Sequence, residues 1–535
     1  MSSVNMDGVG RVGDGGNALH RAIGWKDAFW LASGVPALVL FSIGGIAATI
    51  GNPSWLVWMI SVGFGFIQAF TYAEIAGLFP SKSGGASVYG AAAWVRYSKF
   101  IAPLSVWCNW LAWTPVLAIG TGIAAGYILS AFFAPEASIR TWEVVLFDLS
   151  FLKEGLKLRL NSTFFLGAII MLIVFAIQHR GILNTARIQT IAGVAVLIPL
   201  LIVGIVPFLT GDVVTANLVP LIPSSGAWDN QGWTLFLGGL FIAAWSAYAF
   251  ETAICYTSEF RDPATDTVKA IMSAGLICIV IYTLVPLTFQ GVLGAQGVAA
   301  PGIVDGSGVA AAMARMISGN EAGVVFVLMV VMLLLALLLA IMTAMAGSSR
   351  TLYQGSVDGW LPRYLSYVNE HGAPTRAMWT DLTFNLILLL MSDYLFVLAV
   401  SNCCYIVFNF LNLHAGWIHR IDNAEARRPW KAPTIMLWLG GILAFVNAAL
   451  LGAGANVWGA GTLVSGIVAI ALIIPVFAYR HWVQDGGQFP PRMLDDLTAA
   501  GGNADIRVRR AGLLPSARLA AGGVVVYIAH LIYTT

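Results

Sequence analysis

Two short stretches that interrupt long apolar runs carry the residue types most able to do chemistry. The first, Ser33-Gly34-Val35-Pro36-Ala37, places a glycine two residues before a proline. Proline removes one intrahelical hydrogen bond and its ring clashes with the preceding turn, so a helix through this stretch is expected to break. The second, Trp245-Ser246-Ala247-Tyr248, is followed by Glu251, which ends a run of 21 uncharged residues.

Interrupted helices expose backbone groups that suit a zwitterion. Freed N–H groups at a half-helix N-terminus can receive a carboxylate, and freed C=O groups at a facing C-terminus can receive an ammonium. The predicted substrate contacts come from both breaks and from the third span: Ser33, Gly34, Val35, Ala37, Trp113, Thr114, Trp245, Ser246, Ala247 and Tyr248. The alternative at Gly34 is a simple kink, because Gly and Pro are frequent in membrane helices.

Glu251 should lie at membrane depth, where an ionisable side chain is by default a functional candidate. Because burial favours the neutral form of a carboxyl group, we expect this residue to exchange a proton with the functional cycle. The alternative is a permanently neutral Glu that is hydrogen-bonded between helices. A second intramembrane acid, Asp381, is expected near a helix end and paired with Arg376.

The overall composition excludes several classes of protein. Of 535 residues, 58% are apolar and 10% are charged, whereas soluble domains average about 25% charged residues. A net charge of +2 provides no basic field for nucleic acid. The His and Cys residues show no metal-ligand spacing, and no span carries a nucleophile–base constellation. We therefore expect no enzyme, no metal and no cofactor.

Charge-free runs predict an all-α membrane protein with twelve transmembrane helices, since each crossing needs about 20 mostly apolar residues. The two interruptions fall in spans one and six. That spacing is expected of two inverted five-helix repeats, whose paired broken helices form a site near the midplane. The predicted segments are a disordered tail (1–27), the first repeat (28–212), the second repeat (229–420), two peripheral helices (432–480) and a C-terminal tail (481–535).

The distribution of Lys and Arg predicts the orientation, because short cytoplasmic loops carry the excess of these residues. With the N-terminus inside, the cytoplasmic segments collect 23 of the 28 basic residues. Both termini are therefore expected in the cytoplasm of a multi-pass protein, most simply one of the plasma membrane. The apolar stretch Leu519 to Tyr533 is expected to be an interfacial or packing segment, since 15 residues are short for a crossing.

Four motifs give the chain a resemblance to the amino acid–polyamine–organocation permease superfamily over about residues 28 to 480. They are Glu74-Ile75-Ala76-Gly77-Leu78-Phe79-Pro80-Ser81-Lys82-Ser83-Gly84-Gly85; Ala244 through Glu251 with Ser258-Glu259-Phe260-Arg261-Asp262-Pro263; Ser349-Arg350-Thr351-Leu352-Tyr353 with Asp358-Gly359-Trp360-Leu361-Pro362 and Gly372-Ala373-Pro374; and Arg428-Pro429-Trp430-Lys431-Ala432-Pro433. The resemblance implies ten helices in two inverted repeats plus two peripheral ones.

The resemblance also implies residue roles. The sixth span is similar to that of the arginine–agmatine antiporters, which implies that Trp245 gates the substrate site and that Glu251 couples to protons. Glu74 and Arg350 are then expected as structural charges at an inner gate. Some relatives carry a Lys in the fifth span in place of a sodium ion; the matching position here is Val196.

The expected function is secondary active transport of an amino acid or related small amine by alternating access, coupled to protons or running as exchange. Its partners would be the small-molecule substrate, protons and the lipid bilayer. A sodium symporter of the same fold is the nearest alternative, with Thr343 and Ser348 among the hard oxygen ligands. A sensor that binds amino acids without transporting them is the alternative from another class. The sequence leaves the oligomeric state open.

Overall fold

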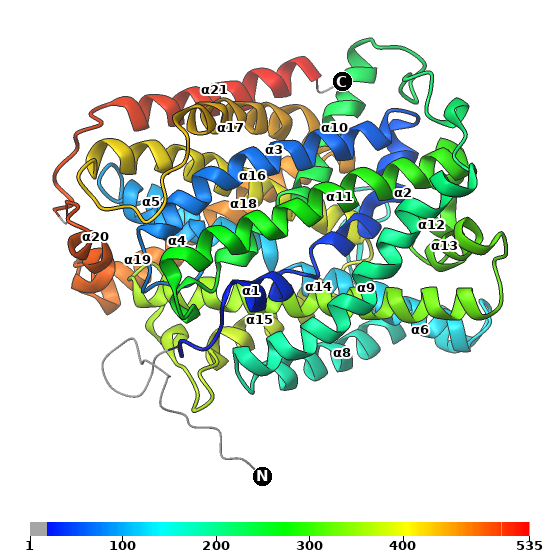
Figure 1. Ribbon diagram of the computed structural model, residues 1–535, viewed down its shortest axis with the longest axis horizontal. Coiled ribbons are helices and arrows are strands. Elements are labelled where there is room, and N and C mark those ends of the chain that lie inside the picture. Colours follow the sequence, from blue (N-terminus) through cyan, green and yellow to red (C-terminus); the bar gives the residue numbers. More distant parts are fainter. Residues whose placement is uncertain (1–18, 504, 534–535) are drawn as a thin grey trace.

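The computed structural model describes residues 19–503 and 505–533, so most of the predicted N-terminal tail lies outside the described residues. Long helices run side by side through the whole length of the molecule (Figure 1). In the first half these are α1 (Trp25–Leu31), α2 (Val39–Ile50), α3 (Ser54–Gly77), α4 (Ala86–Trp94), α5 (Ile101–Trp113), α6 (Val116–Phe132), α7 (Ser138–Thr141), α8 (Ser162–Gln178) and α9 (Ile182–Thr210).

The second half continues the same arrangement. Its helices are α10 (Asn230–Ala247), α11 (Pro263–Val298), α12 (Pro301–Val304), α13 (Val309–Ser318), α14 (Val324–Val357), α15 (Thr375–Leu388), α16 (Tyr394–Asp422), α17 (Thr434–Gly454), α18 (Thr462–Ala471), α19 (Ile473–Ala478), α20 (Asp495–Ala499) and α21 (Leu514–Tyr533). Short helical turns are η1 (Pro36–Leu38), η2 (Thr215–Asn217), η3 (Ala249–Ile254), η4 (Thr257–Glu259), η5 (Arg363–Ser366), η6 (Ala455–Trp458), η7 (Tyr479–Gln484) and η8 (Pro491–Leu494). The described residues form one hairpin, β1 (Glu143–Asp148) with β2 (Lys157–Asn161), between α7 and α8.

Both predicted interruptions are present. Helix α1 ends at Leu31, and the chain passes through a tight turn and η1 before α2 begins at Val39. Pro36 occupies the first position of η1, where its missing N–H costs little. Helix α10 ends at Ala247, and the rest of that span consists of the turns η3 and η4. The two interrupted spans contact each other, because α2 packs on α10 and α1 packs on η3.

A third interruption was not predicted. The third span is divided between α5 and α6, because Thr114 and Pro115 separate the two helices. Pro115 is the N-cap residue of α6, and its carbonyl oxygen accepts a hydrogen bond from the Ile119 N–H at 2.9 Å. The bend directly follows Trp113, which the third span contributes to the candidate functional site.

Close backbone packing surrounds both predicted breaks. A Cβ atom added at Gly34 would lie 2.5 Å from the Leu339 carbonyl oxygen of α14. A Cβ atom added at Gly65 of α3 would lie 2.9 Å from the Ala247 carbonyl oxygen. Only glycine permits approaches this short, and small residues at helix contacts are typical of membrane bundles. The two glycines therefore fix how α14 and α3 pack against the breaks.

Eleven helical segments among the described residues are long and apolar enough to cross a membrane. Ten of them coincide with predicted spans. The predicted fourth and ninth spans are the shorter helices α8 and α15, of 17 and 14 residues. The eleventh segment is α21, which the sequence had suggested as an interfacial or packing stretch.

Helix α21 connects opposite ends of the molecule. It begins beside the end of α16, where Leu514 and Arg518 lie against His414 and Trp417. It ends beside the first turn of α10, where Asn230 donates a 3.0 Å hydrogen bond to the Ile532 carbonyl. Figure 1 shows α21 along the full length of α17. We call the end of the molecule at which α1 begins the N-terminal face.

The first and last described residues lie at opposite ends of the molecule, whereas the sequence predicted both termini on one side of the membrane. Ile23 pairs with Phe260 just after η4, whereas Tyr533 bonds to Thr234 near the start of α10. The span from α10 to η4 separates these two positions. The sequence did not predict a helix of this length, because Arg518 shortened the apolar run. The helix in fact begins at Leu514, and the Arg518 guanidinium lies over the Trp417 ring.

Candidate functional site

Glu251 lies in η3 at the second break, and its side chain is buried. Its Oε1 accepts hydrogen bonds from Trp113 Nε1 at 3.0 Å and from Asn109 Nδ2 at 3.4 Å. Its Oε2 has no hydrogen-bond partner among the described residues and faces Gly85, where an added Cβ atom would lie 3.6 Å away. The carboxyl group thus has neutral donors on one oxygen and no cation on the other.

Trp245 ties three helices together. Its indole Nε1 lies 2.9 Å from the Ala112 carbonyl oxygen of α5 and 3.0 Å from Ser401 Oγ of α16. Ser401 Oγ in turn lies 2.9 Å from the same carbonyl oxygen. The indole is fully buried in this conformation, so any gating movement of Trp245 must break these hydrogen bonds.

The hydroxyl group of Tyr282 joins the two breaks directly. Tyr282 extends from α11 and its Oη lies 2.8 Å from the Val35 carbonyl oxygen and 3.1 Å from the Ser246 carbonyl oxygen. One hydroxyl group thus joins backbone carbonyl oxygens of both interrupted spans. The Val35 carbonyl is not left free by the break, because it also accepts a 3.0 Å hydrogen bond from the Leu38 N–H. The sequence did not indicate Tyr282, because it lies within an apolar run that carries no turn signal.

A second polar contact holds the first break against α9 and α14. The Leu31 carbonyl oxygen accepts hydrogen bonds from Thr343 Oγ1 at 2.8 Å and from Gln189 Nε2 at 3.3 Å, and Gln189 Nε2 also lies 3.0 Å from Thr343 Oγ1. Gln189 Oε1 has no partner among the described residues. Gln189 is thus the polar residue through which the fifth span contacts the first break, whereas Val196, at the position of the Lys in some relatives, is apolar. Ser33 Oγ turns back to the Trp30 carbonyl oxygen at 2.6 Å.

Two predicted contact residues face away from the breaks. Thr114 Oγ1 accepts a 2.6 Å hydrogen bond from Asn385 of α15. Tyr248 Oη donates to Asn447 Oδ1 of α17 at 3.0 Å. Both side chains are of a type that could contact a substrate, but in this structure their hydroxyl groups bond to neighbouring helices.

Open space lies on the side away from the N-terminal face. A cavity of about 400 Å³ is lined by residues that include Tyr127, Arg140, Arg159, Asp305 and Tyr394. A smaller space of about 20 Å³ shares Tyr127 and Tyr394 with it and reaches Ala37 of the first break. These residues outline a route from the opposite face toward the site.

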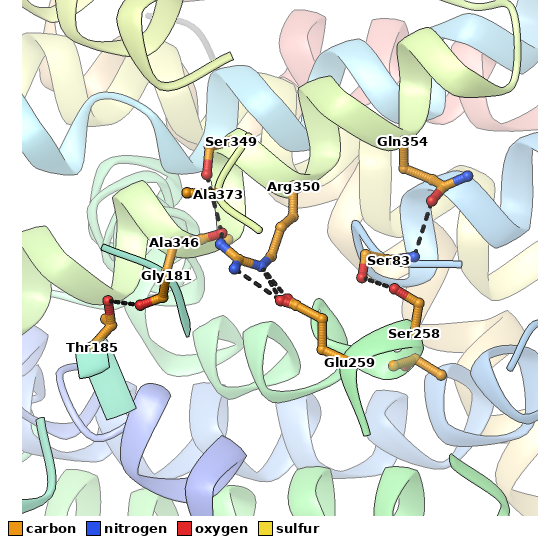
Figure 2. Close-up of polar contacts among 12 residues, drawn as sticks. Ser83, Gly181, Thr185, Ser258, Glu259, Ala346, Ser349, Arg350, Gln354 and Ala373 are labelled. Atoms are coloured by element: carbon orange, nitrogen blue, oxygen red, sulfur yellow. Dashed lines mark hydrogen bonds and ion pairs between the residues drawn. The ribbon is translucent and has the colours of Figure 1, made fainter. Parts of the chain in front are cut away.

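The N-terminal face is closed by a buried polar cluster, here called the N-terminal gate (Figure 2). The guanidinium of Arg350 makes a two-pronged ion pair with Glu259, with Nε to Oε2 and Nη2 to Oε1 both at 2.8 Å. Ser83 Oγ lies 2.6 Å from Ser258 Oγ, and the Ser83 N–H donates to Gln354 Oε1 at 3.1 Å. These contacts join the loop after α3 to η4 and α14.

Further ion pairs lie on the same face. Lys82 Nζ is 2.6 Å from Asp358 Oδ1. Glu74 pairs with Arg420 and Arg428, which places it among structural charges at this end of the molecule, as predicted. The segment before α21 covers the loop after α3, since Ser81 Oγ donates to Asp496 Oδ1 at 2.6 Å. Burial raises the pKa of Asp496, and its bonds with Ser81 oppose that change.

The predicted pair of Asp381 with Arg376 is wrong. The Arg376 guanidinium instead lies 4.6 Å from the centre of the Tyr367 ring. Asp381 is fully buried and accepts hydrogen bonds from Trp110 Nε1 at 2.6 Å and from Ser348 Oγ. Residues five apart on a helix do not share a face, so Asp381 points inward while Arg376 points outward.

The first prediction concerns the N-terminal gate. Glu259→Gln leaves the Arg350 guanidinium buried without a counter-charge, so we expect it to destabilise the protein by about 3–5 kcal/mol. The double variant Arg350→Met/Glu259→Gln should recover part of this loss. Denaturation of the purified protein measures both effects.

The matched control is Arg363→Ala on the same face. Arg363 pairs with Asp485 but is 62% exposed, so its loss should cost at most about 1 kcal/mol. If Glu259→Gln costs no more than this control, the buried pair does not hold the gate closed.

Comparison with known proteins adds to this geometry. The family model described as "Amino acid permease" matches residues 23–487. The chain is 22% identical over 282 residues to the cationic amino acid transporter 9, chloroplastic, of Arabidopsis thaliana, covering 52% of this chain and 46% of that protein. It is 27% identical over 277 residues to the L-methionine/branched-chain amino acid exporter YjeH of Escherichia coli (strain K12), covering 51% and 56%.

A third relative aligns over more of the chain. The polyamine transporter PUT1 of Oryza sativa subsp. japonica is 23% identical over 410 residues, which cover 76% of this chain and 67% of that protein. The alignments to the first two relatives span about half the length of those proteins. The family model covers both interrupted spans, Glu251 and the N-terminal gate. The chain therefore belongs to the amino acid permease family of the amino acid–polyamine–organocation superfamily.

Proposed function

We propose that this chain is a secondary active transporter that moves an amino acid or related small amine by alternating access, coupled to protons or running as exchange. The observation that carries this proposal is that Tyr282 Oη lies between the Val35 and Ser246 carbonyl oxygens of the two interrupted spans, the second of which also holds Glu251, a buried carboxyl group with no cation. The three relatives are named for cationic amino acids, for methionine and branched-chain amino acids, and for polyamines. An amine group is common to all of these compounds.

The geometry supports a specific way of holding the amine. A substrate ammonium would replace the Tyr282 hydroxyl between the Val35 and Ser246 carbonyl oxygens, because both oxygens already point at one donor. Carbonyl oxygens of interrupted helices bind cationic groups in this manner in other transporters. Tyr282 then acts as the group that satisfies the two carbonyls while the site holds no substrate.

The two faces of the molecule support alternating access. The N-terminal gate is closed by buried contacts, whereas the cavity of about 400 Å³ lies toward the opposite face. Transport then requires a second conformation in which Arg350 separates from Glu259 and the cavity of about 400 Å³ closes. A change of this kind between two discrete packings is the usual form of such transitions.

Glu251 is the proposed proton carrier. Its Oε1 accepts from two donors in either protonation state, so the proton would sit on the unpartnered Oε2. Protonation of a buried carboxyl group removes the cost of an unpaired charge at membrane depth. Proton binding and release at Glu251 therefore changes the stability of the packed site.

Sodium coupling remains the second candidate on one observation. Leu31 and Thr343 place two hard oxygen atoms together, with Gln189 beside them. Ser348 does not join them, since its hydroxyl bonds to Asp381. In this conformation the amide of Gln189 occupies the position beside both oxygens, which favours the proton hypothesis.

Counterflow through purified protein in proteoliposomes tests transport itself. The radiolabelled probes are L-arginine, L-methionine, L-leucine, putrescine, 4-aminobutyrate and choline, each measured with and without sodium and with a pH gradient. Exchange of at least one amine supports the proposal. A protein that binds one of these compounds without counterflow would be a sensor, and a strict sodium requirement would replace protons as the coupling ion.

The second prediction concerns Glu251→Gln. Glutamine keeps the acceptor for Trp113 and Asn109 but carries no exchangeable proton. We expect counterflow to persist, whereas accumulation driven by a one-unit pH gradient should fall from as much as about tenfold to none. Glu321→Gln, the same substitution at a glutamate side chain that is 59% exposed, is the control and should retain accumulation. Unchanged accumulation in Glu251→Gln would exclude this residue as the coupling site.

We also propose that the N-terminal face lies in the cytoplasm and that α21 crosses the membrane as an additional span. Loops at this face carry most of the Lys and Arg residues, in agreement with the positive-inside rule. Twenty residues suffice for a crossing. Because α21 runs from the N-terminal face to the opposite face, the last described residue would lie outside the cytoplasm.

The third prediction tests this topology with single cysteines. The five native cysteines are buried, so a membrane-impermeant maleimide should leave them unmodified. In intact cells, Tyr533→Cys should be labelled, whereas the exposed Arg509→Cys should be labelled only after permeabilisation. Equal labelling of both positions in intact cells would place both on one side and refute the additional crossing.

A further inference from the structure

Asp381 is a second buried carboxyl group that the proposed function does not use. It lies in α15, and its side chain is enclosed between α5 and α14. Oδ1 accepts from Trp110 Nε1 of α5 at 2.6 Å, and Oδ2 accepts from Ser348 Oγ of α14. Both donors are neutral, so the surroundings give this acid two hydrogen bonds and no counter-charge.

The charged groups around α15 are committed elsewhere. The elements packed against it are α6, α8, α14 and η5, and α5 supplies Trp110. Their charged residues are Arg350, held by Glu259, and Arg363, held by Asp485. Arg376 of α15 itself stacks on Tyr367. Of the phenols on these elements, Tyr127 accepts from the Ala310 N–H, Tyr364 bonds to Thr380, and Tyr353 packs in a separate cluster with Leu19 and Val368.

The two partners of Asp381 define where a proton can bind. An indole N–H can only donate, so Oδ1 remains an acceptor in either state. A serine hydroxyl both donates and accepts. When a proton from water binds Oδ2, the new O–H donates to Ser348 Oγ, and the Ser348 hydrogen must turn to another acceptor. Loss of the proton to water restores the present bond.

The same two helices connect Asp381 to Glu251. On α5, Trp110 bonds to Asp381 while Asn109 and Trp113 bond to Glu251. On α14, Ser348 bonds to Asp381 while Thr351, three residues later, donates to Asn109 Oδ1 at 3.0 Å. Arg350 of the N-terminal gate lies between these two positions. A change at either acid therefore acts on α5 and α14 together.

The helix that carries Asp381 also contacts the wall of the cavity of about 400 Å³ through Asn385. Asn385 donates to the Asp381 carbonyl oxygen at 2.8 Å and accepts from the Ala118 N–H at 3.1 Å. Ala118 is one of the residues that line the cavity of about 400 Å³. Two hydrogen bonds thus separate the backbone at Asp381 from a residue in contact with that space.

We propose that Asp381 is a second proton-binding site, which takes up and releases a proton during the transport cycle and reports its state to the N-terminal gate through Ser348. The transport part of this proposal rests on the function proposed above. The titration part does not, because it concerns this carboxyl group alone.

Infrared difference spectroscopy of the purified protein in nanodiscs tests the titration, with pH as the only variable. The C=O stretch of a neutral carboxyl group is followed in the wild type, Glu251→Gln, Asp381→Asn and the double variant. We expect two buried-carboxyl signals, of which one is lost in each single variant and both in the double variant. An unchanged spectrum in Asp381→Asn across the whole pH range would overturn the proposal.

Two further variants keep the test decisive if Asp381→Asn fails to fold. Ser348→Ala retains the carboxyl group and should shift the midpoint of its signal, since Oδ2 loses its partner. Thr380→Ala on the same helix should leave the midpoint unchanged and is the matched control, because the Thr380 hydroxyl group bonds to the Arg376 carbonyl and to Tyr364. A signal insensitive to Ser348→Ala would show that the serine does not read the protonation state.

Counterflow then tests the role in the cycle, with whichever compound of the panel the wild-type protein exchanges. Asp381→Asn should alter the pH profile of exchange while Glu251→Gln alters it separately, and the double variant should lose both effects. If only Glu251→Gln changes the profile, Asp381 titrates without a part in transport and the inference fails while the proposed function stands. If no compound is exchanged, the proposed function fails and the infrared result still decides the titration.

Discussion

The unpaired carboxyl group of Glu251 is the constraint on which the rest of the structure depends. A charge at membrane depth without a cation is costly, and Glu251 accepts hydrogen bonds from the neutral donors Trp113 and Asn109. Helix α10 ends before Glu251, and in the turn η3 the Oε2 atom faces Gly85 of the loop after α3. The interruption of α10 thus directs the carboxyl group toward a region that the N-terminal gate covers, and the Ser246 carbonyl beside it accepts from Tyr282.

Side chains of neighbouring helices donate hydrogen bonds to backbone carbonyl groups at the two breaks. Tyr282 serves Val35 and Ser246, and Thr343 with Gln189 serves Leu31. Because a buried backbone group without a partner costs free energy, these side chains let the closed conformation exist without a bound guest. Glycines at positions 34 and 65 allow α14 and α3 to reach the same region by backbone contact. The site is therefore a packed cluster of backbone carbonyl groups, and a bound substrate could replace the side chains that donate to them.

The sequence predicted the parts of this site that have local signals and missed those that depend on tertiary contacts. Pro36 and the small residues after Trp245 predicted both breaks correctly, since these residue types directly affect the backbone conformation. Tyr282 and Gln189 lie in uninterrupted apolar runs, where nothing distinguishes a functional hydroxyl or amide from a packing one. Asp381 was paired with Arg376 from proximity in the chain, although their helical spacing separates their directions. The length of α21 was underestimated because Arg518 interrupted the apolar count, whereas the helix begins at Leu514 and the Arg518 guanidinium lies over the Trp417 ring.

One measurement tests the central claim most directly: the internal pH of proteoliposomes recorded while an amine substrate enters through the wild-type protein, without any imposed ion gradient. If Glu251 carries a proton with each cycle, inward movement of the amine changes the internal pH with its sign set by symport or antiport, and the initial rates of proton and amine movement keep a fixed ratio as the amine concentration varies. Amine transport with no accompanying pH change, at any external pH, would contradict the account.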